Sequence, residues 1–248
     1  MNIDTKDFTW QTSLNYSFNK NEIDKLYNDL ERVGNYFVGQ SINVIYTKRF
    51  GGIWQSDEAE IAKIYNAEPG DYKIIDRNRN NIIDDDDRDF VGQTTPQFFG
   101  SFSNTFKSHG FDLTIFLTYA GGHKIYNPFA YLDSYSPSAN MSPDYYHNYW
   151  TPERPSNKYP RLGSTNSQLY ETDGMYQKGD YIRLKNLELG YTLPRNIANK
   201  VYASNIRVYA SVQNLVTFTK YTGFDVETSN ANPYPACRVF MGGLTVNF

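Results

Sequence analysis

Apolar and polar side chains alternate along residues 8–18. The even positions are mainly apolar, and they are Phe8, Trp10, Thr12, Leu14, Tyr16 and Phe18. The odd positions are small and polar, and they are Thr9, Gln11, Ser13, Asn15 and Ser17. A two-residue period predicts a β-strand with one apolar and one polar face, here about as long as a tilted membrane-crossing strand. A strand of a soluble sandwich would show the same pattern, so this segment alone leaves both architectures open.

Similar patterns predict about seven antiparallel strands and an all-β fold. The later strands are expected at residues 36–50, 98–106, 111–119, 181–193, 206–218 and 238–248. The segment KSHG at 107–110 ends in glycine, as tight hairpin turns prefer. The parity of the fifth strand slips near Lys185 and Asn186, which predicts a bulge. Residues 56–68 have helical spacing instead, with acidic residues in the first turn.

The connections between these strands differ in length. If KSHG marks the short-turn side, the long connections at 55–96, 122–178 and 221–236 all lie on the opposite side. Long unpatterned loops are unusual in a compact soluble domain, but they are expected on the extracellular side of an outer-membrane barrel. Seven strands with open edges cannot close in lipid, so we expect further strands upstream.

Composition agrees with strands that have one apolar and one wet face. Aromatic residues make up 17% of the chain, with 22 Tyr and 16 Phe, although the mean hydropathy is only −0.63. Residues 1–7 are polar, so a signal peptide is expected to precede this chain in a longer protein. The net charge of −3 provides no basic footprint for nucleic acid. The single cysteine, Cys237, excludes an intrachain disulfide framework.

The last segment alternates up to a terminal phenylalanine. Its apolar positions are Phe240, Leu244, Val246 and Phe248, with Gly242 between them. This ending resembles the signal that the outer-membrane barrel assembly machinery reads, so these four residues are the candidate assembly signal.

Eight segments, in order, resemble the C-terminal region of the SusC/RagA family of TonB-linked outer-membrane proteins. They are WQTSLNYSFNKNEIDKL, GGIWQSDEAE, EPGDYKIIDRNRNNIIDDDDR, FGSFSNTFKSHGFDLTIFLTYAGGHKIYN, YWTPERPSNKYPRL, GDYIRLKNLELGYTLP, RVYASVQNLVTFTKYTGFDVE and GGLTVNF. The resemblance implies a 22-stranded barrel of which residues 1–248 form about strands 16 to 22. It implies an importer of oligosaccharides or peptides in the outer membrane of Bacteroidetes. It also implies an absent plug domain that engages TonB and a SusD-like surface lipoprotein as partner.

The segment DRNRNNIIDDDD at 76–87 has the ligand spacing of a calcium loop. The donors would be Asp76, Asn78, Asn80, the carbonyl of Ile82, Asp84 and Asp87, because oxygens at alternating positions of a tight loop can converge on one hard cation. Asn81 stands where such loops have glycine, and Asp87 stands where they have a longer glutamate. An acidic, solvated loop held by side-chain turns is the plain alternative. We therefore expect structural Ca²⁺ as the one candidate cofactor.

The long connection at 122–178 and its flanks are rich in aromatic residues. Tyr145, Tyr146, Tyr149, Trp150, Tyr159 and Tyr170 are candidates to contact a sugar or the lipoprotein lid, although packing of the segment against itself explains them more simply. Catalysis finds no support, because His109, His123 and His147 lie in a turn and a loop without a nucleophile–base spacing.

Two other functions remain open from the sequence. One is a secreted β-sandwich that binds carbohydrate or acts as an adhesin through its calcium loop. The other is an outer-membrane hydrolase, which would need a Ser–His pair on adjacent strands near one rim. For the importer, the polar face with Gln11, Asn15, Ser103 and Thr105 would line the lumen, and the apolar face would contact outer-membrane lipid.

Overall fold

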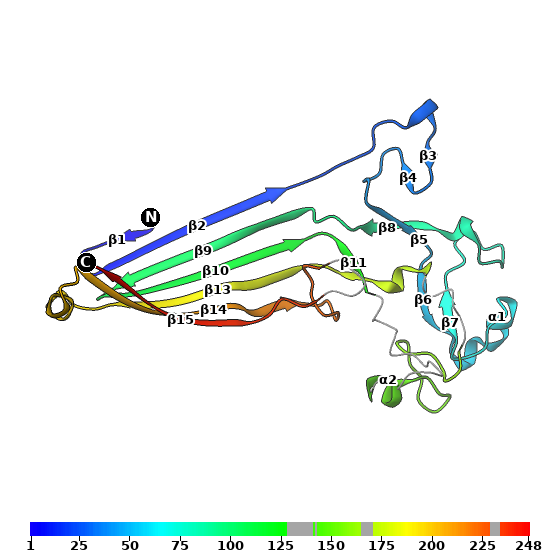
Figure 1. The fold of residues 1–248 in the computed structure, drawn as a ribbon. Helices are drawn as coiled ribbons and strands as arrows, with labels where there is room; N and C mark the ends of the chain where they lie inside the picture. The colour runs from blue at the N-terminus through cyan, green and yellow to red at the C-terminus, as the bar shows by residue number, and fades with distance from the viewer. Residues whose placement is uncertain (128–140, 142, 165–170, 229–233) are drawn as a thin grey trace.

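The computed structural model describes residues 1–127, 141, 143–164, 171–228 and 234–248, and Figure 1 shows one long sheet with a head at one end. Seven antiparallel strands form the sheet in the order β1-β2-β9-β10-β13-β14-β15. Their bounds are β1 Ile3–Asp4, β2 Phe8–Phe18, β9 Phe98–Ser108, β10 Phe111–Gly121, β13 Tyr181–Thr192, β14 Asn205–Thr219 and β15 Val239–Asn247. Apart from β1, each has 9 to 15 residues, which is long enough to span a membrane when tilted.

The head consists of four two-stranded pairs and two short helices. The pairs are β3 Arg32–Val33 with β4 Tyr36–Phe37, β5 Val44–Thr47 with β8 Asp89–Gln93, β6 Phe50–Ile53 with β7 Tyr72–Ile74, and β11 Lys124–Tyr126 with β12 Tyr176–Lys178. The helices are α1 Ala59–Ile64 and α2 Pro143–Asn148. We use "the head" for these elements and the described residues between them. A third helix, α3 Arg195–Ala198, lies in the connection between β13 and β14.

Short and long connections lie at opposite ends of the sheet. The chain turns tightly from β9 to β10 at His109 and Gly110, both with positive φ, as a two-residue hairpin requires. This end of the sheet also holds α3 and both chain termini (Figure 1). All connections that build the head leave from the other end. The predicted separation of short turns from long loops is therefore confirmed.

One predicted strand and one predicted helix are partly wrong. Residues 36–50 do not enter the large sheet: Tyr36–Phe37 and Val44–Thr47 form separate short strands in the head, and β1 is the seventh strand of the sheet instead. The side chains of this segment differ in burial: Ile45 and Thr47 are buried in the head, whereas Ile42 is exposed. The predicted helix 56–68 is a 3-10 turn at Ser56–Glu58 followed by α1, so it ends at Ile64.

The bulge expected near Lys185 is confirmed. Leu184 pairs with Val216 and Asn186 pairs with Gln213, so one residue of β13 lies opposite two residues of β14. Asn214, one of those two, has a φ of +53°. The register between β10 and β13 shifts at the same place. The extra residue restores the face of each side chain beyond it, which explains the slip in parity along the sequence.

The buried apolar core lies in the head. One cluster contains Ile53, Tyr72, Trp150 and Met175, and a second contains Trp54, Ala62 and Ala67. Among the described residues, the seven strands of the sheet contribute only Ala120 to the buried apolar side chains. The sheet is therefore not one layer of a soluble sandwich, because it has no apolar layer packed against it.

Candidate functional site

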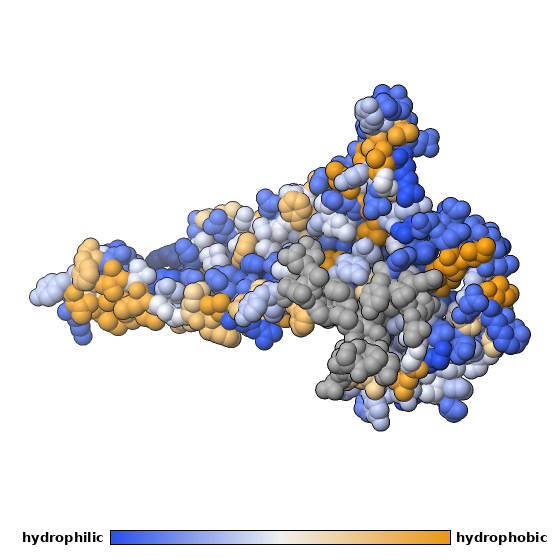
Figure 2. Space-filling model, turned by 45° about the vertical axis from the view of Figure 1, so that its right-hand side comes forward, coloured by the Kyte–Doolittle hydropathy of each residue, from blue (hydrophilic) through white to orange (hydrophobic). Residues whose placement is uncertain are grey.

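One face of the sheet is apolar from edge to edge and lies exposed. The pairing places Leu14, Phe102, Leu117, Leu184 and Val216 in one row across five strands. Several large side chains of this face have more than 60% of their surface exposed, and they are Leu14, Tyr16, Phe18, Phe218, Phe240 and Leu244. In Figure 2 hydrophobic surface runs along the sheet away from the head. An apolar surface of this extent marks an interface with lipid or protein rather than with water.

Aromatic side chains gather at both ends of this apolar face. Near the turn end, the rings of Phe111 and Tyr191 lie 4.5 Å apart between their centroids. Near the head, the rings of Tyr16 and Phe98 lie 6.5 Å apart. Aliphatic residues such as Leu117 occupy the middle. Two aromatic girdles around an aliphatic band are the pattern of strands that cross a bilayer.

The polar atoms on the apolar face satisfy one another. Trp10 Nε1 and Thr12 Oγ1 both donate hydrogen bonds to Asn104 Oδ1, at 2.8 and 2.7 Å. Asn104 is 92% buried by its neighbours although it lies on this face. A lone amide would be costly in hydrocarbon, so the cluster lets Asn104 occur on a lipid-exposed face.

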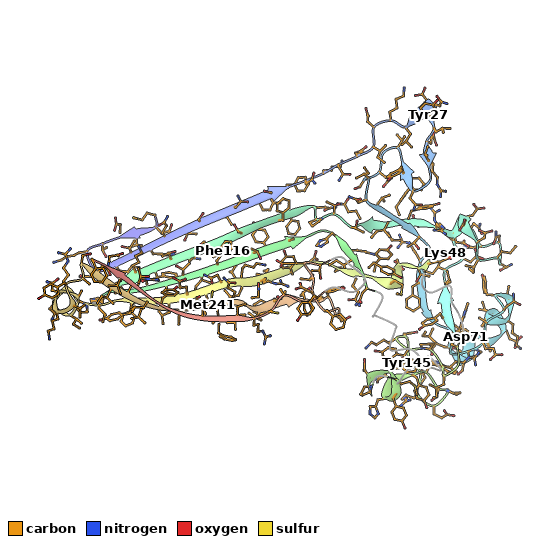
Figure 3. The ribbon with its side chains drawn as sticks, viewed as in Figure 1. Tyr27, Lys48, Asp71, Phe116, Tyr145 and Met241 are labelled. Atoms are coloured by element: carbon orange, nitrogen blue, oxygen red, sulfur yellow. The ribbon has the colours of Figure 1, made fainter. Side chains whose placement is uncertain are left out.

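The opposite face is polar, as the alternation predicted. Gln11 pairs with Thr105, Thr105 with Thr114, Thr114 with Glu188, and Glu188 with Ser211, which makes a row of hydroxyl, amide and carboxylate groups. The predicted lumen residues Asn15 and Ser103 share this face with Gln11 and Thr105. A few apolar side chains, including Phe116 and Met241 in Figure 3, interrupt it.

Two arginines organise the charges on the polar face. Near the turn end, Arg207 binds both Asp112 and Glu188, with 2.5 and 2.7 Å between nitrogen and oxygen. Near the head, Arg183 is almost fully buried and binds Asp225, Glu227 and the hydroxyl of Thr217. The Arg183 contacts fold the residues after β14 onto the polar face. Neither the charges around Arg207 nor those around Arg183 were predicted from the sequence. Their only signal there is an isolated charged residue at a strand position that belongs to the polar face.

The predicted calcium loop is folded around its own carboxylates. Asp76 accepts hydrogen bonds from the backbone amides of Arg79 and Asn81 and from the hydroxyl of Tyr65, at 2.6, 2.8 and 3.0 Å. Asp87 is 99% buried and accepts from the amides of Arg77 and Asp84. Between Asp76 and Asp87 in the sequence come the remaining candidate donors of the loop, which are Asn78, Asn80, Ile82 and Asp84.

Charge and backbone geometry in the loop fit its tight turn. Asn81 has a φ of +65°, the left-handed conformation that glycine would otherwise supply. Burial raises the pKa of the Tyr65 hydroxyl, and the carboxylates of Asp76 and then Asp87 raise it further. Desolvation acts to raise the pKa of Asp76, but the hydrogen bonds from Asn81, Tyr65 and Arg79 together lower it. In the described part of the chain, no group of three or more His, Cys, Asp or Glu side chains is arranged to hold a metal ion.

Most of the predicted contact aromatics pack inside the head. Tyr145, Trp150 and Tyr159 are buried, and Trp150 covers Gly70, where an added Cβ would lie 2.5 Å from its ring. The Tyr159 hydroxyl donates to Asp144 at 2.6 Å. Of the other candidates, Tyr146 is 58% exposed, Tyr149 is half-buried, and Tyr170 lies outside the described residues. Contact with a sugar or a lid is therefore left to Tyr146 and Tyr149 among those described.

Asp71 fastens this aromatic segment to the head (Figure 3). Its carboxylate accepts hydrogen bonds from Arg161 Nε at 3.0 Å and from Ser164 Oγ at 2.7 Å. Asp71 immediately precedes β7, whereas Arg161 and Ser164 follow the buried Tyr159. The contact explains why a segment without sequence periodicity adopts a defined position.

The C-terminal residues end the sheet at its outer strand. Phe240 and Leu244 are 72% and 63% exposed on the apolar face, Val246 is half-buried on the same face, and Phe248 is 88% exposed just after β15. The three histidines stay apart, with His109 in the hairpin turn, His123 beside β11 and His147 in α2. Among the described residues, no helix is long and apolar enough to cross a membrane.

Known proteins with similar sequences are all receptors of one kind. The chain is 31% identical over 278 residues to TonB-dependent receptor P3 of Formosa agariphila, a match that covers 100% of this chain and 27% of that protein. It is 28% identical to TonB-dependent receptor SusC of Bacteroides thetaiotaomicron, covering 99% of this chain and 25% of SusC. No family model matches the chain. Over its whole length, the chain is similar to one part of these TonB-dependent receptors.

Solved structures of similar proteins have the same fold. A chain of the RagAB peptide transporter superposes with a TM-score of 0.80 at 24% identity, over 99% of this chain and 28% of that one. The RagAB peptide importer in its "closed-closed" state superposes with a TM-score of 0.77 at 25% identity. The resemblance to the SusC/RagA family and the all-β fold are thus confirmed. The sheet is barrel wall, and its place is the outer membrane.

The match also sets a limit. The chain spans about a quarter of the length of the curated TonB-dependent receptors that it matches. The two-faced sheet, the head and the loop contacts described above are properties of this chain.

Proposed function

We propose that this chain is the C-terminal part of the barrel of an outer-membrane importer for oligosaccharides or peptides. The observation that carries the proposal is the sheet itself, with one continuous exposed apolar face and one polar face that bears charges. Such a sheet fits a wall between lipid and a water-filled lumen.

The edges of the sheet support a longer barrel. β2 pairs with β1 only at Thr9 and Trp10 on its outer side, and β15 lies at the other edge of the sheet. Unpaired backbone groups cost several kcal/mol each in hydrocarbon, so neighbouring strands must cover both edges. The missing strands and a plug domain would come from the part of the receptor that precedes these residues.

The proposed partners follow from the family. A SusD-like lipoprotein would cover the head, and the TonB complex would supply energy through the plug. RagAB is a peptide importer, which supports peptides as one candidate substrate class. Oligosaccharides are the other class, which the resemblance to the SusC/RagA family implies. A secreted sandwich module is not favoured, because the described residues form no second large sheet.

Uptake by whole cells tests this function. The full-length gene and, separately, the gene for its lipoprotein partner would be deleted, and growth and uptake would be measured on defined glycans and peptides. We expect loss of growth on one class of oligomer and unchanged growth on its monomer. Equal uptake of every oligomer by deletion and parent strains would contradict the proposal.

We also propose that residues 76–87 bind Ca²⁺ as a structural ion in the head. The spacing of oxygen donors supports this, and so does the tight fold of the loop, in which Asp76 and Asp87 both accept backbone amides of the loop itself. Bound calcium would use the remaining lone pairs of these carboxylates and replace part of the hydrogen bonding that now satisfies them. The ion would stiffen the loop rather than take part in transport.

The C-terminal residues are proposed to act in assembly. Phe240, Leu244, Val246 and Phe248 remain the candidate signal, and the exposed side chains of Phe240, Leu244 and Phe248 support this role. Truncation of Phe248 should lower the amount of folded receptor in the outer membrane, whereas Asn247→Ala, at a position of opposite parity, should not. Immunoblots of heat-modifiable receptor in membrane fractions measure the difference.

A further inference from the structure

A polar pocket lies in the head, outside the wall and the calcium loop. It encloses about 480 Å³ and is lined by Asn35, Asn43, Tyr46, Arg88, Glu171 and Tyr176, among others. These residues come from the region of β3 and β4, from β5, from the start of β8, and from β12, which are distant in sequence. The volume would hold one residue of a peptide or one sugar unit with its neighbours.

Two cations, Lys48 and Arg88, face one carboxylate, Glu171, at this pocket. Lys48 adjoins it, with only 5% of its surface exposed, and its ammonium lies 3.4 Å from Glu171 Oε2. Arg88 Nη2 approaches the same carboxylate oxygen only to 3.9 Å. Glu171 is 56% exposed while Lys48 is buried, and Asp85 is a second carboxylate that pairs with Arg88 alone. A buried ammonium with so loose a partner favours any further anion that can approach.

The guanidinium of Arg88 is held in a position from which it can bind such an anion. Its Nε donates to Asp85 Oδ1 at 2.9 Å, which fixes the plane of the guanidinium. Within the described residues, its two terminal nitrogens make no hydrogen bond, and Nη2 lies 3.9 Å from Glu171 Oε2. Arg88 lines the pocket, and 26% of its side chain is exposed. An arginine held in this way presents a fork that matches a carboxylate in two parallel hydrogen bonds.

We propose that this pocket recognises a carboxylate of the transported oligomer through Arg88, with the charge of Lys48 behind it. Without substrate, the Glu171 carboxylate lies beside Lys48 and Arg88. When the substrate carboxylate binds, Glu171 moves away or shares these two cations with it. Tyr46 and Tyr176 flank the pocket with aromatic rings, and Asn35 and Asn43 supply amides for neighbouring polar groups. The inference rests on the proposed transport function, and it narrows the substrate class to acidic oligomers.

Two sources of carboxylate fit equally, and paired probes separate them. Binding to the purified full-length receptor with its lipoprotein partner would be measured by calorimetry. One pair is trigalacturonic acid and its methyl ester; the other is a tripeptide with a free C-terminal carboxylate and the same peptide amidated. We expect the acid to bind at least tenfold more tightly than the neutral compound in one pair, which identifies the source.

Three variants test the residues. Arg88→Gln should weaken binding of the acidic probe roughly tenfold and leave the neutral probe unchanged. Glu171→Gln should strengthen binding of the acidic probe several-fold, because it removes the competing charge; a merely structural residue would not have this effect. Arg49→Gln is the matched control, since Arg49 pairs with Asp89 in the head but does not line the pocket.

The inference is overturned if neither acid binds more tightly than its neutral counterpart, or if Arg88→Gln and Arg49→Gln have equal effects. Either result would leave the proposed import intact, because growth of the deletion strains tests import separately. If the deletion strains import every oligomer normally while the purified receptor still prefers the acidic probes, the transport proposal fails and the pocket proposal stands.

Discussion

The guanidinium of Arg183 lies 2.6 Å from Asp225 Oδ1, and both side chains are at least 96% buried. Arg183 belongs to β13 of the wall, whereas Asp225 belongs to the connection that follows β14. The second oxygen of Asp225 accepts the backbone amide of Ala236 at 2.8 Å, so the same carboxylate also joins the two ends of that connection. One ion pair therefore fixes a loop to the polar face of the barrel wall.

Replacing Arg183 should release this loop. Burial acts to raise the pKa of Asp225, but the hydrogen bonds from Arg183 and two backbone amides lower it, so the carboxylate is charged at neutral pH. Arg183→Gln would leave that charge buried without its partner, at a cost of about 3 kcal/mol. We expect protease cleavage near residues 221–228 and a lower unfolding temperature in detergent. Lys185→Gln, which removes only an exposed contact to Glu227, should have little effect on either measurement.

The two faces of β2 should respond oppositely to charge. Leu14→Arg would place a cation on the exposed apolar face and should destabilise the folded receptor in bilayers by about 2–4 kcal/mol. Ser13→Arg, one residue earlier on the polar face, should change stability by less than about 1 kcal/mol. Urea unfolding of the full-length receptor in lipid vesicles measures both variants. Equal destabilisation by the two would contradict the assignment of the faces.

Calcium should stabilise the head if residues 76–87 bind it. Addition of Ca²⁺ to chelator-treated receptor should raise the temperature at which the head unfolds, followed by protease resistance of the loop. Asp76→Ala should abolish the effect because it removes a carboxylate that would contact the ion. Asp86→Asn is the control, since its side chain falls between the expected ligand positions. A calcium effect that survives Asp76→Ala would place the ion elsewhere.

Residues 121–127 and 176–180 join the sheet to the head, and we call them the neck. Acid should weaken the neck at His123. Burial lowers the pKa of His123 below its ordinary value of 6.5, while Asp180 opposes the shift. The unfolded neck therefore binds more protons than the folded one just below pH 6.5, so stability falls as the pH falls through that value. The hydrogen-exchange protection factors of residues 121–127 and 176–180, which correct for the intrinsic pH dependence of exchange, should fall between pH 7.5 and pH 5. His123→Gln, which cannot gain a proton, should flatten that part of the pH dependence.

Local pattern was enough to predict the wall. The alternation of β2, β9, β10 and β15 shows in the sequence because each strand has neighbours only to its sides, so one face meets lipid and the other water along its whole length. The bulge at Lys185 was visible for the same reason, as a slip in that alternation. The calcium spacing of residues 76–87 was equally readable, since all its candidate donors lie within a single loop.

The head could not be predicted in the same way. Residues 36–50 alternate like a membrane strand, yet β5 pairs with β8 inside the head, because pairing partners far along the chain decide where a short strand lies. The same holds for Tyr145, Trp150 and Tyr159, which seemed suited to contact a ligand but are buried against β6 and β7 and their own segment.

By itself, the sequence determined that this chain forms barrel strands with two unlike faces, and its likeness to known receptors follows from the same residues. Only the tertiary structure decided which charges meet. Arg183 and Asp225 are 42 residues apart, and Lys48 and Glu171 are 123 apart. Contacts of this kind depend on loop closure and burial rather than on any local period, so no pattern along the chain records them.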